Sequence, residues 1–158
     1  MALFILVRQF ERGGRPTRAR SVRLYLDHLR HINNWDLVDL SAPRLLGPWL
    51  WDQKRELLYR LAQSPNLWER RIALLATLHF IRHEEFEDTL ALAAQVLADR
   101  EDLIHKAAGW MLREIGKRDI ACAELFLQKH CRTMPRTMLR YAIERFTPAK
   151  RQKFMNGG

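Results

Sequence analysis

The sequence predicts an all-α protein built as a HEAT-like helical-repeat α-solenoid, curved and with a basic concave face. Apolar residues recur at helical spacing along nearly the whole chain, and alternating apolar and polar stretches are few. The seven Gly and six Pro fall mostly between these periodic segments. Roughly ten short helices in recurring amphipathic pairs are typical of helix-pair solenoids. A globular helical bundle is the alternative.

The chain of 158 residues is long enough for one domain with a real core and short for two. We therefore expect a single domain over residues 1–158, with basic N-terminal helices (1–32), central helical repeats (33–146) and a basic tail (147–158). The net charge of +9 is concentrated at the two ends, and the middle is mildly acidic. Clustered Arg and Lys favour a polyanionic partner such as nucleic acid, although a solubilising surface would have the same composition.

The expected helices follow from the apolar spacing and from the residues that start and stop helices. The Gly13–Gly14 pair should end the first helix, and Asn66 with Glu69 is spaced like a capping box before the most apolar one. In order, the helices should cover residues 2–12, 18–31, a short helix capped by Asn33 or Asn34, another opened by Pro43 and interrupted at Gly47–Pro48, then 54–63, 67–82, 86–98, 102–117, 120–130 and 135–146.

The short helix after Asn34 carries a tryptophan and a carboxylate on one face. Trp35 and Asp39 are four residues apart, so they lie one above the other. Trp35, Val38 and Ala42 fit a buried stripe, and Asp39 falls on its edge. A carboxylate buried there without a partner would cost several kcal/mol, so Asp39 either pairs with an Arg or has a function.

Two arginines, Arg70 and Arg71, occupy the first turn of the 67–82 helix, where positive charge opposes the helix dipole. Leucines follow Arg71 at i+3, i+4 and i+7, so its side chain emerges from an apolar side. An inward guanidinium requires an anion, which could be Asp36, Asp39 or a DNA phosphate.

The 102–117 helix has a clear apolar stripe that one large aromatic residue does not join. Trp110 stands about 120° from the centre of that stripe, on the side of Lys106 and Arg113, and Gly109 leaves room beside it. An indole flanked by two cations suits a groove for a phosphate backbone. Packing against a neighbouring helix is the alternative.

Near the C-terminus, Arg132, Arg136 and Arg140 repeat every four residues. We expect them on one helix face, as candidates for nonspecific contact with a DNA backbone.

Other chemistries find little support. The two cysteines, Cys122 and Cys131, lack metal-ligand spacing and are expected to be free thiols in a reducing cytoplasm. There is no glycine-rich phosphate loop or G-x-S-x-G elbow, and the six His are scattered. The sequence has no apolar run long enough for a bilayer. We therefore expect no metal, no cofactor and no membrane partner.

Four segments together carry a family resemblance: NNWDLVDLSA (33–42), NLWERRIALLAT (66–77), DLIHKAAGWMLREIGKRD (102–119) and MPRTMLRYAIERF (134–146). In this order and spacing they resemble the AlkD-like DNA alkylation-repair family, HEAT-repeat DNA glycosylases that remove alkylated purines. The similarity extends from about Val22 to Phe146. It implies that Trp35, Asp39, Arg71 and Trp110 are the active-site residues.

The resemblance implies a monofunctional glycosylase acting on double-stranded DNA that carries cationic N3- or N7-alkylated purines. Asp39 would stabilise oxocarbenium character on the sugar, Trp35 and Trp110 would face the cationic lesion, and Arg71 would hold a phosphate. We expect DNA contacts from Arg70, Lys106, Arg113, Arg132, Arg136 and Arg140. A noncatalytic HEAT module, or a scaffold with a buried Asp39–Arg71 ion pair, remains the alternative.

Members of this family have additional helices before the equivalent of Ala2. The apolar segment Met1–Val7 is therefore expected to expose surface and to allow self-association. The expected location is the cytoplasm of a bacterium, in association with the nucleoid.

Overall fold

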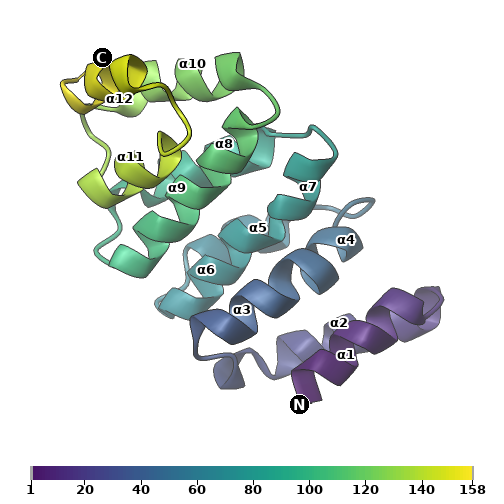
Figure 1. Cartoon of the computed structure of the whole chain (residues 1–158). Coiled ribbons are helices and arrows are strands. Elements are labelled where there is room, and N and C mark those ends of the chain that lie inside the picture. The colour runs from purple at the N-terminus through teal and green to yellow at the C-terminus, as the bar shows by residue number, and fades with distance from the viewer. Residues whose placement is uncertain (1, 158) are drawn as a thin grey trace. The chain divides into compact units, whose positions relative to one another are not determined.

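A computed structural model describes residues 2–157, in which every regular element is helical and no strand occurs. The predicted all-α class is therefore confirmed. The chain divides into two compact units, Met1–Phe80 and Ile81–Gly158, which we call the N-terminal and C-terminal units. Each is described by itself (Figure 1). The curvature, the basic concave face and the single-domain organisation stay predictions.

The N-terminal unit contains the helices α1 to α6, with α7 carrying the boundary between the units. Their bounds are α1 Ala2–Arg12, α2 Arg15–Asp27, the 3-10 turn η1 Leu29–His31, α3 Trp35–Ser41, the π-helical segment η2 Ala42–Leu46, α4 Gly47–Trp49, α5 Glu56–Ala62, α6 Leu67–Ala76 and α7 Leu78–Arg82.

Alternate helices of this unit contact each other directly. Helix α6 packs against α5, its neighbour in sequence, and also against α3 and η2. The core between them is mainly apolar, with side chains such as Leu45, Leu46, Leu58, Ile72 and Leu75 removed from solvent. A chain in which each helix pairs both with its neighbour and with the next helix but one has the contact pattern of helical repeats.

The C-terminal unit repeats this pattern around α9. Its elements are α8 Glu87–Gln95, the 3-10 turn η3 Val96–Ala98, α9 Asp102–Gly116, α10 Ile120–His130, α11 Arg136–Ala142 and α12 Pro148–Met155. Helix α9 contacts α8 and α10 and packs most closely against α11. Its apolar stripe, which includes Ile104, Met111 and Ile115, is fully buried as the spacing predicts.

Several expected helix boundaries were wrong: α2 covers Arg15–Asp27 and not 18–31, and α11 ends at Ala142 and not at 146. Two further differences have identifiable causes. The helix that begins at Trp35 runs through Pro43 and Gly47 without interruption, because its middle widens into a π-helix around the proline. The expected 67–82 helix breaks instead at Thr77, whose hydroxyl donates to the Leu74 carbonyl at 2.6 Å. Hydrogen bonding back into the preceding turn is a known way to bend a helix.

The segment expected to be a basic tail is helix α12. Thr147 caps it by accepting from the Lys150 amide, with Pro148 at the first helical position. Phe154 is 2% exposed and its ring lies 5.9 Å from that of Phe146. One buried aromatic side chain therefore anchors an otherwise basic helix.

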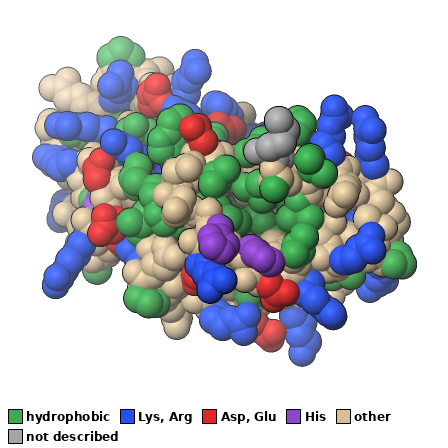
Figure 2. All heavy atoms as spheres, turned by 90° about the horizontal axis from the view of Figure 1, so that it is seen from below, with side chains coloured by type: hydrophobic (Ala, Val, Ile, Leu, Met, Phe, Trp, Pro, Cys, Tyr) green, Lys and Arg blue, Asp and Glu red, His purple; other side chains and the backbone are tan. Residues whose placement is uncertain are grey.

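The apolar start of the chain forms part of an open groove. Of the segment Met1–Val7, the first residue lies outside the described part; Leu6 and Val7 are buried, whereas Phe4 and Ile5 are 44% and 49% exposed. The groove has a volume of about 680 Å³ and lies between α1, α2 and η1. Figure 2 shows apolar side chains gathered on this face with basic groups around them. The predicted exposure is confirmed for Phe4 and Ile5 and was wrong for Leu6 and Val7, and self-association through this segment stays a prediction.

Candidate nucleic-acid site

Helix α3 begins where the sequence predicts, because Asn34 caps it. The Asn34 side chain accepts a hydrogen bond from the Leu37 amide at 3.0 Å. At the far end of the helix, the Ser41 hydroxyl donates to the Leu37 carbonyl at 2.6 Å and meets the Tyr25 hydroxyl at 3.0 Å. Burial raises the pKa of Tyr25 despite this hydrogen bond, so the phenol stays neutral. The helix is thus fixed at both ends.

Trp35 does not belong to the buried stripe in which the sequence placed it. Val38 and Ala42 are fully buried, but Trp35 is 54% exposed. It is the first residue of α3. An indole exposed one turn from Asp39 is available to a ligand.

Asp39 and Arg71 form a two-pronged ion pair between α3 and α6. The Arg71 Nε donates to Asp39 Oδ1 and its Nη2 donates to Oδ2, both at 3.0 Å. The Arg71 side chain is 7% exposed and the Asp39 side chain 21%. The structure therefore selects Asp39, not Asp36, as the carboxylate that meets Arg71. The Asp39 carboxylate therefore stays partly exposed, while its two hydrogen bonds to Arg71 set its orientation.

Arg70, next in sequence, turns back on its own helix start. Its Nη1 donates to the carbonyls of Ser64 and Pro65, at 2.9 and 3.1 Å. Asn66 completes the cap by accepting from the Trp68 amide at 2.9 Å. The two arginines at this helix N-terminus thus bind oxygen acceptors, which offsets their unfavourable position in the helix dipole.

In the C-terminal unit, Trp110 lies half-buried on α9 among paired charges. The two cations expected beside it both have carboxylate partners: Lys106 pairs with Asp102 at 2.8 Å, and Arg113 pairs with Glu144. In this structure both cations are thus paired with carboxylates, and their contact with DNA stays a prediction. Their Asp and Glu partners follow from helix spacing in one case and from the tertiary fold in the other.

Glu114, which accepts a hydrogen bond from the indole itself, was not among the residues expected at the site. Trp110 Nε1 donates to Glu114 Oε1 at 3.3 Å. The same oxygen accepts from Lys117 Nζ at 2.6 Å, and Arg118 Nη1 lies 3.4 Å from the other oxygen. Burial alone would raise the pKa of Glu114, but Lys117, Trp110 and Arg118 outweigh it and hold that pKa below its ordinary value. Its position four residues after Trp110 was the available signal.

The row Arg132, Arg136 and Arg140 does not lie on one helix. Helix α10 ends at His130 and α11 begins at Arg136, so Arg132 lies in the turn between them. Arg132 Nε donates to the Gly157 carbonyl at 3.0 Å, and Arg136 Nη1 donates to that of Met155 at 2.7 Å. Both therefore bind the end of α12. Within residues 2–157, the exposed side chain of Arg140 makes no hydrogen bond or ion pair.

The cysteines, the possible metal ligands and the helix lengths also bear on the sequence-based expectations. Cys122 and Cys131 are free, the first half-buried and the second buried. Among residues 2–157, no three His, Cys, Asp or Glu side chains come together as a metal site would require. In the same range, every helix is too short or too polar to cross a bilayer.

Of the four residues expected at the active site, three lie in the N-terminal unit, where Asp39 and Arg71 are in direct contact and Trp35 is one turn away. Trp110 belongs to the C-terminal unit. The fold and these side chains define a helical-repeat protein in which an ion pair fixes a partly exposed carboxylate, one helical turn from an exposed aromatic ring.

The comparison with known families identifies that class more closely. A family model described as DNA alkylation repair enzyme matches residues 1–146, and the chain belongs to this family. The resemblance carried by the four sequence segments is thereby confirmed, and with it a role in DNA repair with DNA as partner. No curated protein matches the sequence significantly.

Proposed function

We propose that this chain is a DNA glycosylase that hydrolyses the N-glycosidic bond of cationic N3- or N7-alkylated purines in duplex DNA and leaves an abasic site. The family supports DNA repair by an enzyme, and the bond that is cleaved is our own inference. It acts as a monofunctional hydrolase without strand cleavage, in the bacterial cytoplasm and in association with the nucleoid.

The observation that carries the proposal is the geometry of Asp39. Two hydrogen bonds from Arg71, both 3.0 Å long, fix its carboxylate, yet its side chain remains 21% exposed. A carboxylate that is fixed but accessible can stabilise positive charge developing nearby without reorganising during the reaction. The exposed Trp35 ring, one turn away, supplies an electron-rich face for a cationic base.

The chemistry requires few groups. The alkylated purine is already cationic, so it can leave without being protonated. The C1′–N9 bond breaks, its electron pair passes to the purine and neutralises it, and the deoxyribose takes on oxocarbenium character. Asp39 stabilises that charge and orients a water molecule, whose oxygen forms the new bond to C1′ while its proton passes to the carboxylate or to solvent. No lysine nucleophile takes part.

The remaining side chains have supporting roles in this proposal. Trp110 provides a second aromatic face for the lesion, and Arg71 holds Asp39, with a phosphate as a further ligand of its guanidinium. The sugar-phosphate backbone is bound by basic side chains. Of the proposed DNA contacts Arg70, Lys106, Arg113, Arg132, Arg136 and Arg140, the last is the most accessible, because it is exposed and unpaired within residues 2–157.

The test is release of free base from a duplex with one N7-methylguanine, measured at matched DNA occupancy. We expect the wild-type chain to release the base and Asp39→Asn to lose at least about a hundredfold in rate, the scale for removing one preorganised electrostatic group. Asp36→Asn is the matched control, since Asp36 is exposed on the same helix, and it should keep the wild-type rate. Equal rates for Asp39→Asn and wild type would contradict the proposal.

A second candidate is a noncatalytic helical-repeat module that binds DNA, because a two-pronged, largely buried ion pair is also what a structural contact between α3 and α6 would be. Salt-dependent binding without base release would favour this candidate. DNA contact itself predicts a slope of about −0.9 per neutralised phosphate in log affinity against log salt. A flat salt dependence would argue against both candidates.

A further inference from the structure

The indole N–H of Trp110 donates to Glu114, and this contact gives a role to Glu114, which lies outside the expected site. Helix α9 presents Trp110 immediately after Gly109, which packs against α11 so closely that a Cβ there would lie 2.5 Å from the Met138 carbonyl oxygen. The backbone beneath the indole is therefore fixed by packing. The two side-chain torsions of Trp110 remain, and its hydrogen bond to Glu114 restricts them.

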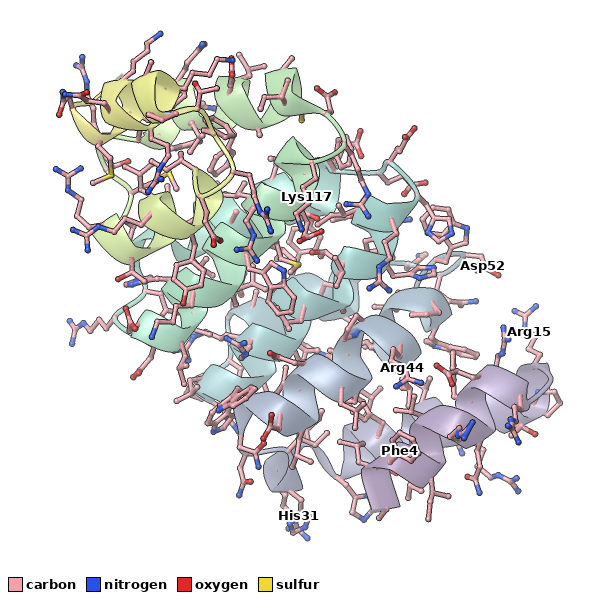
Figure 3. All side chains as sticks on the ribbon, in the orientation of Figure 1. Phe4, Arg15, His31, Arg44, Asp52 and Lys117 are labelled. Carbon is pink, nitrogen blue, oxygen red and sulfur yellow. The ribbon has the colours of Figure 1, made fainter. Side chains whose placement is uncertain are left out.

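Glu114 is itself immobilised from the other side. Its side chain is 13% exposed, and its carboxylate meets Lys117 at 2.6 Å and Arg118 at 3.4 Å. The Arg118 guanidinium also donates to the Glu114 carbonyl at 3.0 Å. Lys117 follows directly after the last residue of α9 (Figure 3). A carboxylate held by two cations is a fixed acceptor, so it can orient a ring that donates to it.

A negative charge at the N–H edge of an indole has a second consequence. The ring carries a quadrupole with a negative face and a positive edge. An anion that accepts from the edge polarises the ring in the direction that makes its face more negative. The face then attracts positive charge more strongly, and during base release such charge develops on the deoxyribose next to the departing purine.

We propose that Glu114 is a positioning residue for base excision, which sets the plane of Trp110 and strengthens the attraction of its face for the positive charge that the deoxyribose gains as the glycosidic bond breaks. This inference rests on the proposed glycosylase function. Glu114 acts only through the indole and touches neither substrate nor reacting atoms. Its effect should therefore appear in the rate of base release and vanish when the indole N–H is absent.

The experiment is a double-mutant cycle read by single-turnover base release from N7-methylguanine DNA at saturating protein. Glu114→Leu should slow release about tenfold, the scale of one lost charge-assisted hydrogen bond, with DNA affinity unchanged. Glu114→Gln keeps an oxygen acceptor and should stay within about threefold of wild type. In a Trp110→Phe background, which has no indole N–H, Glu114→Leu should cause no further loss.

A spectroscopic readout accompanies the cycle. The indole N–H resonance of Trp110, assigned by its disappearance in Trp110→Phe, should shift in Glu114→Leu and move much less in Glu114→Gln. Glu124→Leu is the matched control, because it removes a carboxylate that pairs with Lys150 in the same unit, and it should change neither rate nor resonance.

Four outcomes would overturn the inference. An unchanged rate in Glu114→Leu, or the same loss in both backgrounds, would mean that Glu114 does not act through Trp110 while the glycosylase function stands. An unshifted indole resonance would mean that the contact is absent in solution. A wild-type chain that releases no base would refute the proposed function, and the role of Glu114 in it would fall with it.

Discussion

Gly47 in the N-terminal unit and Gly109 in the C-terminal unit occupy the same kind of helix contact. A Cβ on Gly47 would lie 2.4 Å from the Ala76 carbonyl oxygen, and one on Gly109 would lie 2.5 Å from that of Met138. The partners follow the glycines by 29 residues in both units, and the next atoms met, on His79 and Tyr141, follow by 32. The same joint therefore occurs twice, as expected for a helical repeat.

The polar chemistry built on these joints differs. In the N-terminal unit, Arg71 binds Asp39 through both Nε and Nη2. In the C-terminal unit, Arg113 reaches Glu144 through Nη1, and its buried Nε has no hydrogen-bond partner. The Arg71 guanidinium therefore binds both oxygens of its carboxylate through two parallel hydrogen bonds, and the Arg113 guanidinium does not. This difference indicates that the joint is a property of the repeat, whereas the Asp39–Arg71 pair is a local feature of one site.

The largest effect on stability should come from placing a methyl group at the two glycine contacts. Gly47→Ala and Gly109→Ala should each lower the free energy of unfolding by about 3 kcal/mol, because the new methyl group meets a backbone carbonyl that cannot yield. Urea unfolding would measure this. Gly14→Ala is the matched control, since the nearest atom to its Cβ is 4.0 Å away. If one glycine tolerates alanine and the other does not, the two joints are not equivalent.

The next effect separates the two arginines. Arg71→Lys should lower the free energy of unfolding by about 2 kcal/mol, because an ammonium cannot replace the two parallel hydrogen bonds to Asp39. Arg113→Lys should change it by less than about 0.5 kcal/mol, since the lost Nε has no partner to leave behind. Denaturant unfolding of both variants tests this. Equal losses would show that the fork geometry adds nothing.

A smaller contrast is expected between the two tryptophans. Trp110→Ala should lower the free energy of unfolding by about 1.5 kcal/mol, because the half-buried ring and its hydrogen bond are both lost. Trp35→Ala should change it by less than about 0.5 kcal/mol, since that ring is 54% exposed. Thermal unfolding would show the contrast. A Trp35→Ala loss as large as that of Trp110→Ala would mean that Trp35 packs against the core.

The smallest effect concerns acid. The pKa of Glu114 is lowered in the folded chain, so its charged form adds stability above the ordinary carboxyl pKa, and this contribution disappears as the pH falls through the lowered value. Wild type should therefore be more stable than Glu114→Gln at pH 7, and the difference should vanish in strong acid. A difference that persists unchanged in strong acid would contradict this prediction.

Much of the fold was accessible from local patterns. Helices α1 and α10 begin and end where predicted, and the Asn34 cap and the α9 stripe are also as expected. These features depend on residues within one or two turns, which sequence spacing describes well. The failures at Pro43 and α12 involve a local rule that contacts elsewhere override, whereas the break at Thr77 accompanies a hydrogen bond into its own preceding turn. A proline ends most helices, but here Gly47 permits close packing that favours continuing the helix.

The sequence by itself determined the helical class, the family and the residues to examine, because amphipathic spacing and four ordered segments are properties of the chain alone. Only the tertiary structure decided which charges meet between different helices. Arg71 could have faced Asp36, Asp39 or a phosphate, and the contact between α3 and α6 selects Asp39. Charge pairing depends on a few ångströms between helices distant in sequence, and spacing along one helix carries no information about that distance.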